Sequence, residues 1–437
     1  MPRASLQRRR RVGSALVASG ALGSVLLLAT ACTGDSSAPA STAASSSPAS
    51  GSSARSSTGG GSGSTPAVTA SPGTTSPGSA GGSTAYPSGT ASACVSSVFA
   101  GMSADERLGQ LFMVGIQPGQ APAGIDATVK SSHVGAVIYL GGWSGATMVR
   151  NTATHLQQVA SGPVDLLIAA DQEGGAVQQL KGAGFTNLPA ALDQGQLSTE
   201  RLSALGRTLA GELASAGVNV DLAPVADTVP PTMTKTNAPI GVYRRELGTD
   251  PAVVAAAVPV LVKALQDGKV IAAVKHFPGL GRITGNTDRT NVGITDALTN
   301  ASDPYLEPFR AGITAGVGLV MVSSARYPQL DSANPAMFSR AVVTGLLRER
   351  MGYAGVVITD DVGAAKAVAT VPVGDRAVRF LAAGGDIVLT ASPAQVPTML
   401  AAIHARATSD PAFAAGLDAS VQRVLALKAR FGLVRCG

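Results

Sequence analysis

The chain has 437 residues, of which 45 % are hydrophobic and 14 % charged, and its formal net charge at pH 7 is +6. The first 31 residues hold five arginines and no acidic residue, so the rest of the chain carries a net charge of only +1. The overall positive charge therefore gives no reason to expect binding to nucleic acid. With three cysteines, four histidines, no HExxH motif, no paired-cysteine ligand set and no dinucleotide fingerprint, the sequence implies neither a metal site nor a cofactor.

The N-terminal segment, residues 1–31, is typical of an export signal. Arg8 to Arg11 precede an apolar stretch over 12–31, and small residues at 29–31 stand directly before Cys32. This arrangement is similar to a bacterial lipobox, which implies cleavage before Cys32, lipid attachment to its sulfur and an extracytoplasmic protein anchored to the cell membrane. An uncleaved transmembrane anchor is the alternative interpretation of an apolar run of this length.

Residues 32–92 are rich in Ser, Thr, Gly, Ala and Pro and contain almost no large apolar side chain. Such a segment cannot bury enough surface to offset the entropy of ordering it, so we expect a disordered tether. The remaining two cysteines, Cys94 and Cys436, flank the rest of the chain at its two ends. In an exported protein such a pair predicts a disulfide, with two free thiols as the alternative. We expect residues 93–437 to form a single, monomeric catalytic domain.

Short apolar runs alternate with amphipathic segments along this body, which predicts buried strands separated by helices. Two examples of the helical pattern are 251–266 and 338–352, with apolar residues at three- and four-residue spacing. Eight such strands with intervening helices are typical of a (β/α)8 barrel in the α/β class. The expected strands are 111–116, 134–139, 165–170, 218–224, 270–276, 318–324, 355–361 and 386–390.

A doubly wound open sheet is the rival fold, and periodicity alone does not distinguish it from the barrel. The position of the polar residues favours the barrel, because they stand where predicted strands end. In a barrel these carboxyl ends meet on one face, where such enzymes place their active sites. The residues concerned are Asp171, Glu173, Asp227, Lys275, His276, Ser323, Asp360 and Asp361.

Two motifs at strand ends carry pairs of carboxylates. In GVVITDDVG (355–363), Asp360 and Asp361 are adjacent, so we expect only one of them to face the barrel mouth, and one could simply cap a helix. In AADQEGGAVQQL (169–180), Asp171 and Glu173 lead into a double glycine that lets the backbone approach a ligand. Carboxylates suit paired sugar hydroxyls because they accept two hydrogen bonds. A tight turn with a cap is the alternative for this second motif.

Together with KHFPG (275–279), these motifs make the body resemble glycoside hydrolase family 3, in particular its single-domain bacterial β-N-acetylhexosaminidases. The resemblance covers nearly all of residues 100–435, and its blocks occur in the expected order. They include MSADERLGQLFMVG (102–115), DQEGG (171–175), LAPVAD (222–227), IGVYRRELGTDP (240–251), KHFPG (275–279), TGLLRERMGYAGVVITDD (344–361), AAGGDIVL (382–389) and SVQRVLALKARFGL (420–433).

The resemblance implies that Asp360 is the catalytic nucleophile of a retaining glycosidase, forming a covalent glycosyl intermediate, with Asp361 as its structural neighbour. It further implies that four residues bind the hydroxyls of the terminal sugar. They are Asp171, Arg245, Lys275 and His276. One extra residue before the arginine block makes Arg244 a credible substitute for Arg245, and His276 could instead be a packed supporting residue.

The loop after KHFPG departs from the family. In the family, an Asp-Ser-His sequence in this loop supplies the general acid and base, whereas this chain has Asn286, Thr287 and Asp288 there. Retaining hydrolysis needs a proton donor, and a carboxylic acid serves if burial or the charge of Asp360 raises its pKa. Our hypothesis is that Asp288 is the acid and base and Asn286 positions it, with glycines at 279, 281 and 285 letting the loop close. A plain surface loop, a donor elsewhere and a substrate-supplied donor are the alternatives.

Two further departures affect specificity. Arginines usually follow the family's DxEGG block, whereas Ala176 and Gln179 stand there in this chain, so a preference for N-acetylglucosamine is implied only by analogy. Ser323 and Ser324 replace a position that often holds histidine in cytoplasmic relatives, and we expect them to fill the barrel rim rather than to contact sugar.

The expected function is thus an exported, membrane-tethered retaining β-glycosidase that releases terminal β-N-acetylglucosamine from cell-wall glycan fragments. A β-glucosidase or a glycoside phosphorylase on the same barrel is the alternative within enzymes. A catalytically weak sugar-binding lipoprotein is the alternative outside them.

Overall fold

The computed structural model describes residues 89–119 and 123–436, so the expected signal, Cys32 and most of the expected tether lie outside the described residues. Its first helix begins at Gly89, ahead of the domain boundary expected at residue 93. No helix in the described part of the chain is long and apolar enough to span a bilayer.

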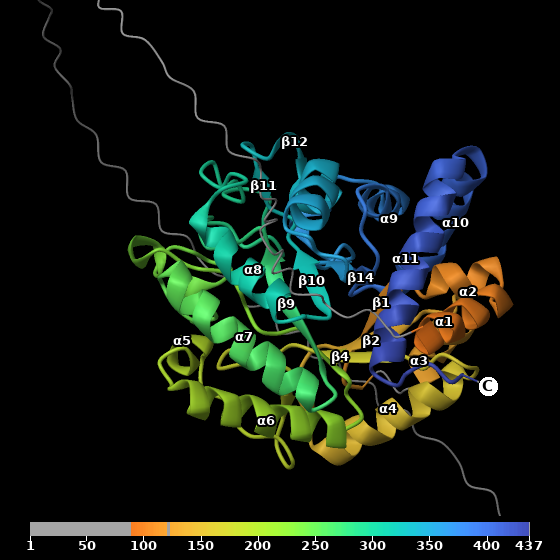
Figure 1. The fold of residues 1–437 in the computed structure, drawn as a ribbon, viewed down its shortest axis with the longest axis horizontal. Helices are drawn as coiled ribbons and strands as arrows, with labels where there is room; N and C mark the ends of the chain where they lie inside the picture. The colour runs from red at the N-terminus through yellow and green to blue at the C-terminus, as the bar shows by residue number, and fades with distance from the viewer. Residues whose placement is uncertain (1–88, 120–122, 437) are drawn as a thin grey trace, which may run out of the picture. The chain divides into compact units, whose positions relative to one another are not determined.

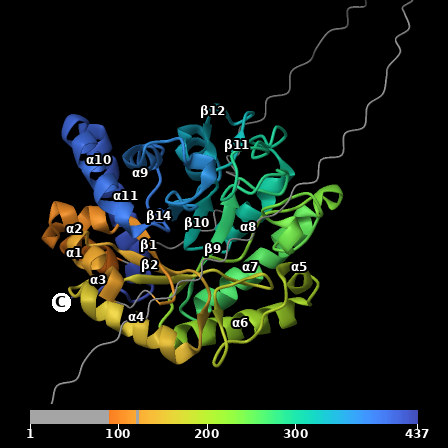
Figure 2. The ribbon, with the colours of Figure 1, turned by 180° about the vertical axis from the view of Figure 1, so that it is seen from behind.

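Eight parallel strands form the centre of the molecule (Figures 1 and 2). They pair in chain order, and β14 then pairs with β1 in parallel register. The ring closes between β13 and β14 through the parallel bridge Ile358↔Ile387. This closure excludes the open sheet and confirms the predicted barrel. The strands are β1 (Phe112–Ile116), β2 (Ala136–Tyr139), β4 (Leu167–Ala170), β8 (Val220–Asp221), β9 (Ile271–Phe277), β10 (Leu319–Val322), β13 (Val356–Thr359) and β14 (Val388–Thr390).

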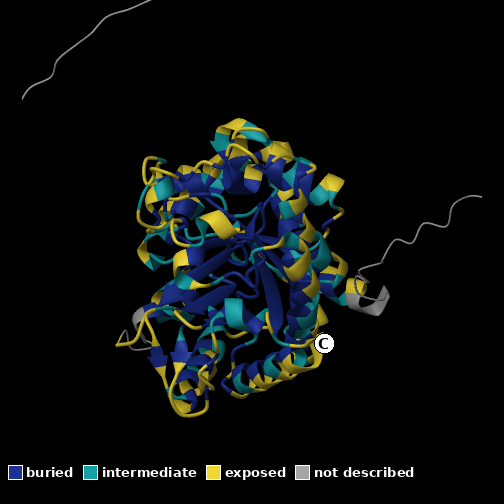
Figure 3. Cartoon of the chain, turned by 90° about the vertical axis from the view of Figure 1, so that its left-hand side faces the viewer, coloured by how far each residue is buried: buried dark blue, intermediate teal, exposed yellow. Residues whose placement is uncertain are grey.

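All eight strands are buried along their whole length, which explains their continuous apolar runs. Helices surround them, with buried inner faces and exposed outer faces (Figure 3). The α-helices are α1 (Gly89–Gly101), α2 (Ala104–Gly109), α3 (Ala123–Ser131), α4 (Ala146–Ala160), α5 (Ala191–Gln194), α6 (Thr199–Ser215), α7 (Pro251–Asp267), α8 (Glu307–Thr314), α9 (Val373–Ala382), α10 (Val396–Ser409) and α11 (Pro411–Arg430).

Asp-Pro pairs set the start of two long helices. The side chain of Asp250 accepts a hydrogen bond from the backbone N–H of Ala252 at the start of α7, and Asp410 does the same for Phe413 in α11. The proline that follows each aspartate stands where a helix needs no N–H donor, so both residues favour a helix beginning there. The helix predicted over 251–266 is therefore found almost unchanged, whereas the one expected over 338–352 is a wider, π-type helix, η5 (Ala341–Arg350).

Short elements lie in the connections between strands and helices. Two antiparallel pairs and one parallel pair lie outside the barrel: β5 (Gln172–Gly174) with β6 (Val177–Gln178), β11 (Arg326–Tyr327) with β12 (Asp331–Pro335), and β3 (Trp143–Ser144) with β7 (Leu180–Lys181). The 3₁₀ turns are η1 (Pro231–Met233), η2 (Gly241–Tyr243), η3 (Pro304–Leu306), η4 (Ala336–Phe338), η6 (Lys366–Val368) and η7 (Pro393–Gln395).

The two ends of the domain are joined covalently. Cys94 in α1 forms a disulfide with Cys436, and their Cα atoms are 5.5 Å apart. Helix α11 packs against α1, so the last helix of the chain covers the first. In the same helix α11, Lys428 is fully buried, and its Nζ donates to Gln110 Oε1 at 2.6 Å and to the carbonyl oxygen of Gly135 at 2.9 Å.

Candidate active site

A cavity of about 320 Å³ opens at the carboxyl ends of the barrel strands. Its walls come from residues at or after β2, β4, β8, β9, β10, β13 and β14, so most of the ring contributes. Every residue that the sequence assigned to catalysis or sugar binding lines this one cavity. The polar lining residues are Asp171, Gln179, Arg245, Lys275, His276, Asn286, Thr287, Asp288, Asp360 and Asp361.

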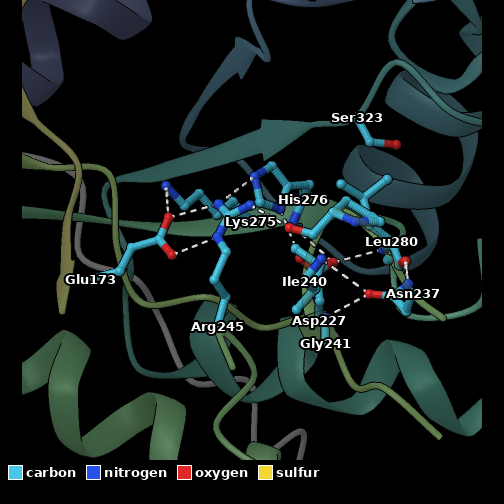
Figure 4. A network of polar contacts seen from close by, with 12 residues as sticks. Glu173, Asp227, Asn237, Ile240, Gly241, Arg245, Lys275, His276, Leu280 and Ser323 are labelled. Atoms are coloured by element: carbon cyan, nitrogen blue, oxygen red, sulfur yellow. Dashed lines mark hydrogen bonds and ion pairs between the residues drawn. The ribbon is translucent and has the colours of Figure 1, made fainter. Parts of the chain in front are cut away.

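The buried end of the cavity is a network of paired charges centred on Glu173. Lys275 Nζ lies 2.5 Å from Asp171 Oδ1 and 2.6 Å from Glu173 Oε1. Arg245 completes a two-point contact with Glu173, with Nε 2.8 Å from Oε2 and Nη2 2.7 Å from Oε1. Only 2 % of the Glu173 side chain is exposed, and Figure 4 shows Arg245 and Lys275 converging on it. Such a pairing fixes both cations rigidly.

These pairings decide the protonation of the network. Burial alone would raise the pKa of Glu173, but the charges of Arg245 and Lys275 outweigh it and lower that pKa to about 2. Burial would likewise lower the pKa of Lys275, yet Asp171 and Glu173 raise it. Both groups are therefore charged at neutral pH, and Asp171 and Lys275 present fixed hydrogen-bonding groups to a polar ligand.

His276 is held in one tautomer by a buried carboxylate. Its Nδ1 lies 2.7 Å from Asp227 Oδ2, while Asp227 Oδ1 accepts the backbone N–H groups of His276 and Leu280 (Figure 4). Because a carboxylate only accepts hydrogen bonds, Nδ1 carries a proton, and Arg245 Nη2 lies 3.5 Å from the other ring nitrogen, Nε2. Lys275 and His276 both line the cavity although they are adjacent in β9, and the peptide bond between them is cis.

The expectation that only one of Asp360 and Asp361 faces the barrel mouth is wrong, because both line the cavity. Strand β13 ends at Thr359, so the alternation of side chains no longer applies to either residue. Their environments differ. Asp361 accepts backbone N–H groups from Gly363, Ala364 and Ala391, which joins the loops after β13 and β14. Among the described residues, Asp360 accepts only the N–H of Asp361.

The loop after KHFPG lies against the cavity instead of standing free. At Gly281 a Cβ atom would come within 1.7 Å of the carbonyl oxygen of Thr228, so only glycine lets the loop pass there. Asn237 ties the same loop to the segment before η2, donating to the carbonyl oxygens of Leu280 and Ile283. Farther along, the carbonyl oxygens of Thr287 and Asp288 accept N–H groups from residues 367 and 366, which follow β13 in the chain.

This arrangement brings Asp288 into the same cavity as Asp360. Burial raises the pKa of Asp360 to about 6, and the neighbouring charge of Asp288 adds to that shift. Asp288 is accessible from the open cavity, but the surrounding protein still raises the pKa of its carboxyl group, against the lowering effect of His276 and Arg245. Asn286 Oδ1 accepts the backbone N–H of Asp288 at 2.9 Å, so it shapes the turn rather than contacting the carboxyl group.

The profile of the Glycosyl hydrolase family 3 N terminal domain matches residues 103–427. The chain belongs to glycosyl hydrolase family 3. It is a glycoside hydrolase by that membership. It is 30 % identical over 337 residues to the β-hexosaminidase LpqI of Mycobacterium tuberculosis, covering 75 % of this chain and 83 % of that protein. A β-hexosaminidase of Xanthomonas euvesicatoria is 32 % identical over 285 residues, which are 64 % of this chain and 82 % of that one.

Among solved structures, the β-N-acetylhexosaminidase of Beutenbergia cavernae is 43 % identical and superposes with a TM-score of 0.73. The match covers 75 % of this chain and 98 % of that one. Hence both the sequence and the barrel place this chain beside β-hexosaminidases of glycosyl hydrolase family 3.

The structure distinguishes between the two arginines that the sequence offered for sugar binding. Arg245 reaches the cavity, whereas Arg244 has a left-handed backbone (φ 56°) and pairs with the exposed Asp193. Ser323 and Ser324 are fully buried and do not line the cavity, so the expectation that they fill the barrel rim is also wrong. Ser323 Oγ instead bonds the hydroxyl of Tyr327.

Sequence reasoning missed three supporting residues. Asp227 stood at a strand end but received no role, and Glu173 was interpreted as a carboxylate suited to sugar hydroxyls rather than as the partner of Lys275 and Arg245. An aspartate in LAPVAD and a glutamate in DQEGG beside the KHFPG block were the available signals for the first two. Asn237 accepts the nearby backbone N–H groups of Ile240 and Gly241, but the loop that it holds, at Leu280 and Ile283, lies more than 40 positions away, so no local pattern reveals that role.

Proposed function

We propose that this chain is an exported, retaining β-N-acetylhexosaminidase that removes a terminal β-N-acetylglucosamine from cell-wall glycan fragments. The observation that carries the proposal is the division of the cavity. Its buried end holds paired, fixed charges suited to sugar hydroxyls, and the carboxyl groups of Asp360 and Asp288 face the same space without an ion pair to a described residue.

In the first step the ionised carboxylate of Asp360 attacks the anomeric carbon. The bond from that carbon to the glycosidic oxygen breaks, and Asp288 donates its proton to the departing oxygen. In the second step Asp288, now ionised, takes a proton from water. That water attacks the same carbon and releases Asp360, so the anomeric configuration is retained. Asp171, Arg245, Lys275 and His276 hold the sugar through its hydroxyls.

The raised pKa values of both acids support a proton shared between them. Two carboxyl groups that repel each other titrate as a pair, so over an interval of pH they share one proton. A pair with one ionised and one protonated member is the state that the first step requires. The paired charges at the buried end do not titrate in that interval, because the pKa of Glu173 lies near 2.

The choice of sugar rests on the relatives, whose names are β-hexosaminidase. The test is to incubate the full chain with a fluorinated inactivator of N-acetylglucosamine type and, separately, one of glucose type. We expect the first to label Asp360, as located by mass spectrometry of peptides. Labelling by the glucose reagent alone would change the sugar class, and binding without any label would indicate a sugar-binding protein.

Hydrolysis is distinguished from phosphorolysis with an aryl β-N-acetylglucosaminide. We expect the rate of aryl alcohol release to be unchanged by inorganic phosphate and the product to be free sugar. A sugar 1-phosphate as the main product would make the chain a phosphorylase.

The export part of the proposal rests on residues 1–32, which lie outside the described residues. We propose cleavage before Cys32 and lipid attachment to its sulfur. The test is incorporation of labelled fatty acid by cells producing the full chain, which the Cys32→Ser variant should abolish. Retention of label by that variant, or an intact N-terminus on the membrane-bound protein, would favour the transmembrane anchor.

A further inference from the structure

We propose that Asp221 is a positioning residue for the sugar-binding end of the cavity: it holds the turn that carries Asp171 and Glu173, and it supports sugar binding best in its protonated form. The inference rests on the proposed function, because it takes the network around Lys275 as the place where the terminal sugar binds. Asp221 acts on the sugar only through these neighbours, since its side chain is fully buried and does not line the cavity.

The backbone places Asp221 between the two strands that lead into this network. In the parallel register Asp221 of β8 is paired with Ala170 of β4 on one side and with Ala272 of β9 on the other. The residue after Ala170 is Asp171, and Lys275 follows Ala272 by three positions. Asp221 is thus adjacent in the sheet to both sources of the paired charges.

Asp221 fixes the turn after β4 by accepting a hydrogen bond. Its Oδ1 accepts the backbone N–H of Gln172 at 3.0 Å, and Gln172 is the residue between Asp171 and Glu173. The side-chain amide of Gln172 is bonded in turn to the backbone of Leu180, through Nε2 at 2.8 Å and Oε1 at 3.0 Å. Because Gln172 is held at both its backbone and its side chain, the two acids that flank it keep fixed positions in the network.

The other oxygen of Asp221 favours the protonated form. Oδ2 is buried and has no hydrogen-bond partner among the described residues. A buried carboxylate with an unpaired oxygen costs more free energy than a neutral carboxylic acid, because the charge loses its hydration. Burial is accordingly the main cause that raises the pKa of Asp221 to about 7, and the charges of Asp171 and Glu173 add to it. The N–H of Gln172 and the charge of Lys275 act in the opposite direction.

Loss of this proton changes the charge balance of the sugar-binding end. With Asp221 neutral, the two cations of this end, Arg245 and Lys275, are matched by the two carboxylates to which they are bound. With Asp221 ionised, a third negative charge acts on Lys275. The sugar-binding end then carries an excess of negative charge.

The added charge weakens the contact of Lys275 with a sugar. An ammonium group has three N–H donors, of which Asp171 and Glu173 accept one each, so one is left for a sugar hydroxyl. A further carboxylate beside the ammonium reduces its attraction for that oxygen. Sugar affinity should therefore fall as the pH rises through about 7, and by thermodynamic reciprocity a bound sugar should favour protonation of Asp221.

The experiment measures binding of an aryl β-N-acetylglucosaminide in which sulfur replaces the glycosidic oxygen, so that the ligand resists hydrolysis. Dissociation constants are determined by calorimetry from about pH 6 to about pH 8 for the full-length chain and for Asp221→Asn. The amide keeps an oxygen for the N–H of Gln172 and cannot ionise. We expect equal affinity at about pH 6, and about three- to tenfold tighter binding by Asp221→Asn than by the unaltered chain at about pH 8.

Two comparisons separate Asp221 from other titrating groups. Asp360 and Asp288 are present in both proteins, so the ratio of the two dissociation constants isolates Asp221. Asp165→Asn is the matched control for an acid-to-amide change elsewhere near β4, because Asp165 pairs with Arg435 and does not line the cavity. This control should follow the pH profile of the unaltered chain.

Asp221→Ala tests the hydrogen bond separately from the charge. Alanine cannot ionise, but it also offers no acceptor to Gln172, so at every pH the Ala variant should bind about fivefold more weakly than the Asn variant. If neither variant folds, proton exchange on binding is measured for the unaltered chain near pH 7, in buffers of different ionisation enthalpy. We expect uptake of up to about half a proton, and release of a proton or no exchange would contradict the proposal.

Equal pH profiles for the unaltered chain and Asp221→Asn, or equal affinities of Asp221→Asn and Asp221→Ala in folded protein, would overturn this inference and leave the proposed function standing. Failure of the unaltered chain to bind the ligand at any pH would overturn the proposed function together with it.

Discussion

The two ends of the cavity differ in what happens to their charges. At the buried end Lys275 and Arg245 are locked to Asp171 and Glu173, so their charges are fixed over the whole neutral range of pH. Near the opening Asp360 and Asp288 lack such partners, and their pKa values are raised. Under the proposed mechanism, the groups that hold the sugar are immobile, whereas the two carboxyl groups that react with it are free to titrate.

The largest expected effect is at Asp360, the proposed nucleophile. Asp360→Asn should lower kcat on an aryl glycoside by about 10⁴-fold or more, because an amide cannot form the glycosyl intermediate. The change in kcat is measured from the release of the aryl alcohol in stopped-flow and steady-state experiments. Lys275→Met, at the buried end, should instead raise KM with a smaller loss of kcat, and a reversed pattern would contradict the division between holding and reacting groups.

The next effect concerns the loop acid. Asp288→Ala should lower kcat by about 10²- to 10⁴-fold on a substrate with a poor leaving group and far less on a dinitrophenyl glycoside, which needs no proton. Added azide should restore turnover by replacing the water step. Thr287→Ala, on the same loop, is the control for loop damage. Full turnover of the poor substrate by Asp288→Ala would show that the proton comes from elsewhere.

A smaller effect is expected far from the cavity, at the disulfide. The double substitution Cys94→Ser and Cys436→Ser should lower the free energy of unfolding by about 2–4 kcal/mol, since the crosslink closes a loop with a sequence separation of 342. Denaturant unfolding measures this change, and kcat should stay within about twofold. A large loss of kcat in folded protein would mean that the joined ends shape the cavity.

The smallest effect is a pH dependence from Asp221, a fully buried acid beside the paired charges. Burial raises its pKa to about 7. Its contribution to stability is therefore complete below the unfolded-state pKa and is lost as pH rises through 7. Asp221→Asn should gain about 1 kcal/mol relative to the unaltered chain between pH 6 and pH 8. Parallel pH profiles of unfolding for the two proteins would contradict the assignment.

Much of the fold was accessible from sequence because strands buried on both sides leave continuous apolar runs, and each of the eight predicted strands overlaps one of the eight barrel strands. Helix α7 was equally accessible, since Asp250 and Pro251 mark its start locally. The cavity-lining residues at strand ends were also predictable, because the carboxyl ends of all barrel strands meet on one face.

What sequence could not supply were contacts across the chain. Glu173 becomes central only because Lys275, about a hundred residues later, folds onto it. The choice of Arg245 over Arg244 depends on a left-handed turn at Arg244 that no apolar pattern records. That Asp361 also lines the cavity depends on where β13 ends, and strand ends are where periodic patterns are least informative.

The seam between β13 and β14 has a consequence for how activity appears during synthesis. The bridge that closes the ring, Ile358↔Ile387, and the bond from Ala391 to Asp361 both join the surroundings of Asp360 to residues 387–391. A nascent polypeptide that lacks these residues has no completed wall behind Asp360. A product truncated before β14 should therefore show no glycoside cleavage.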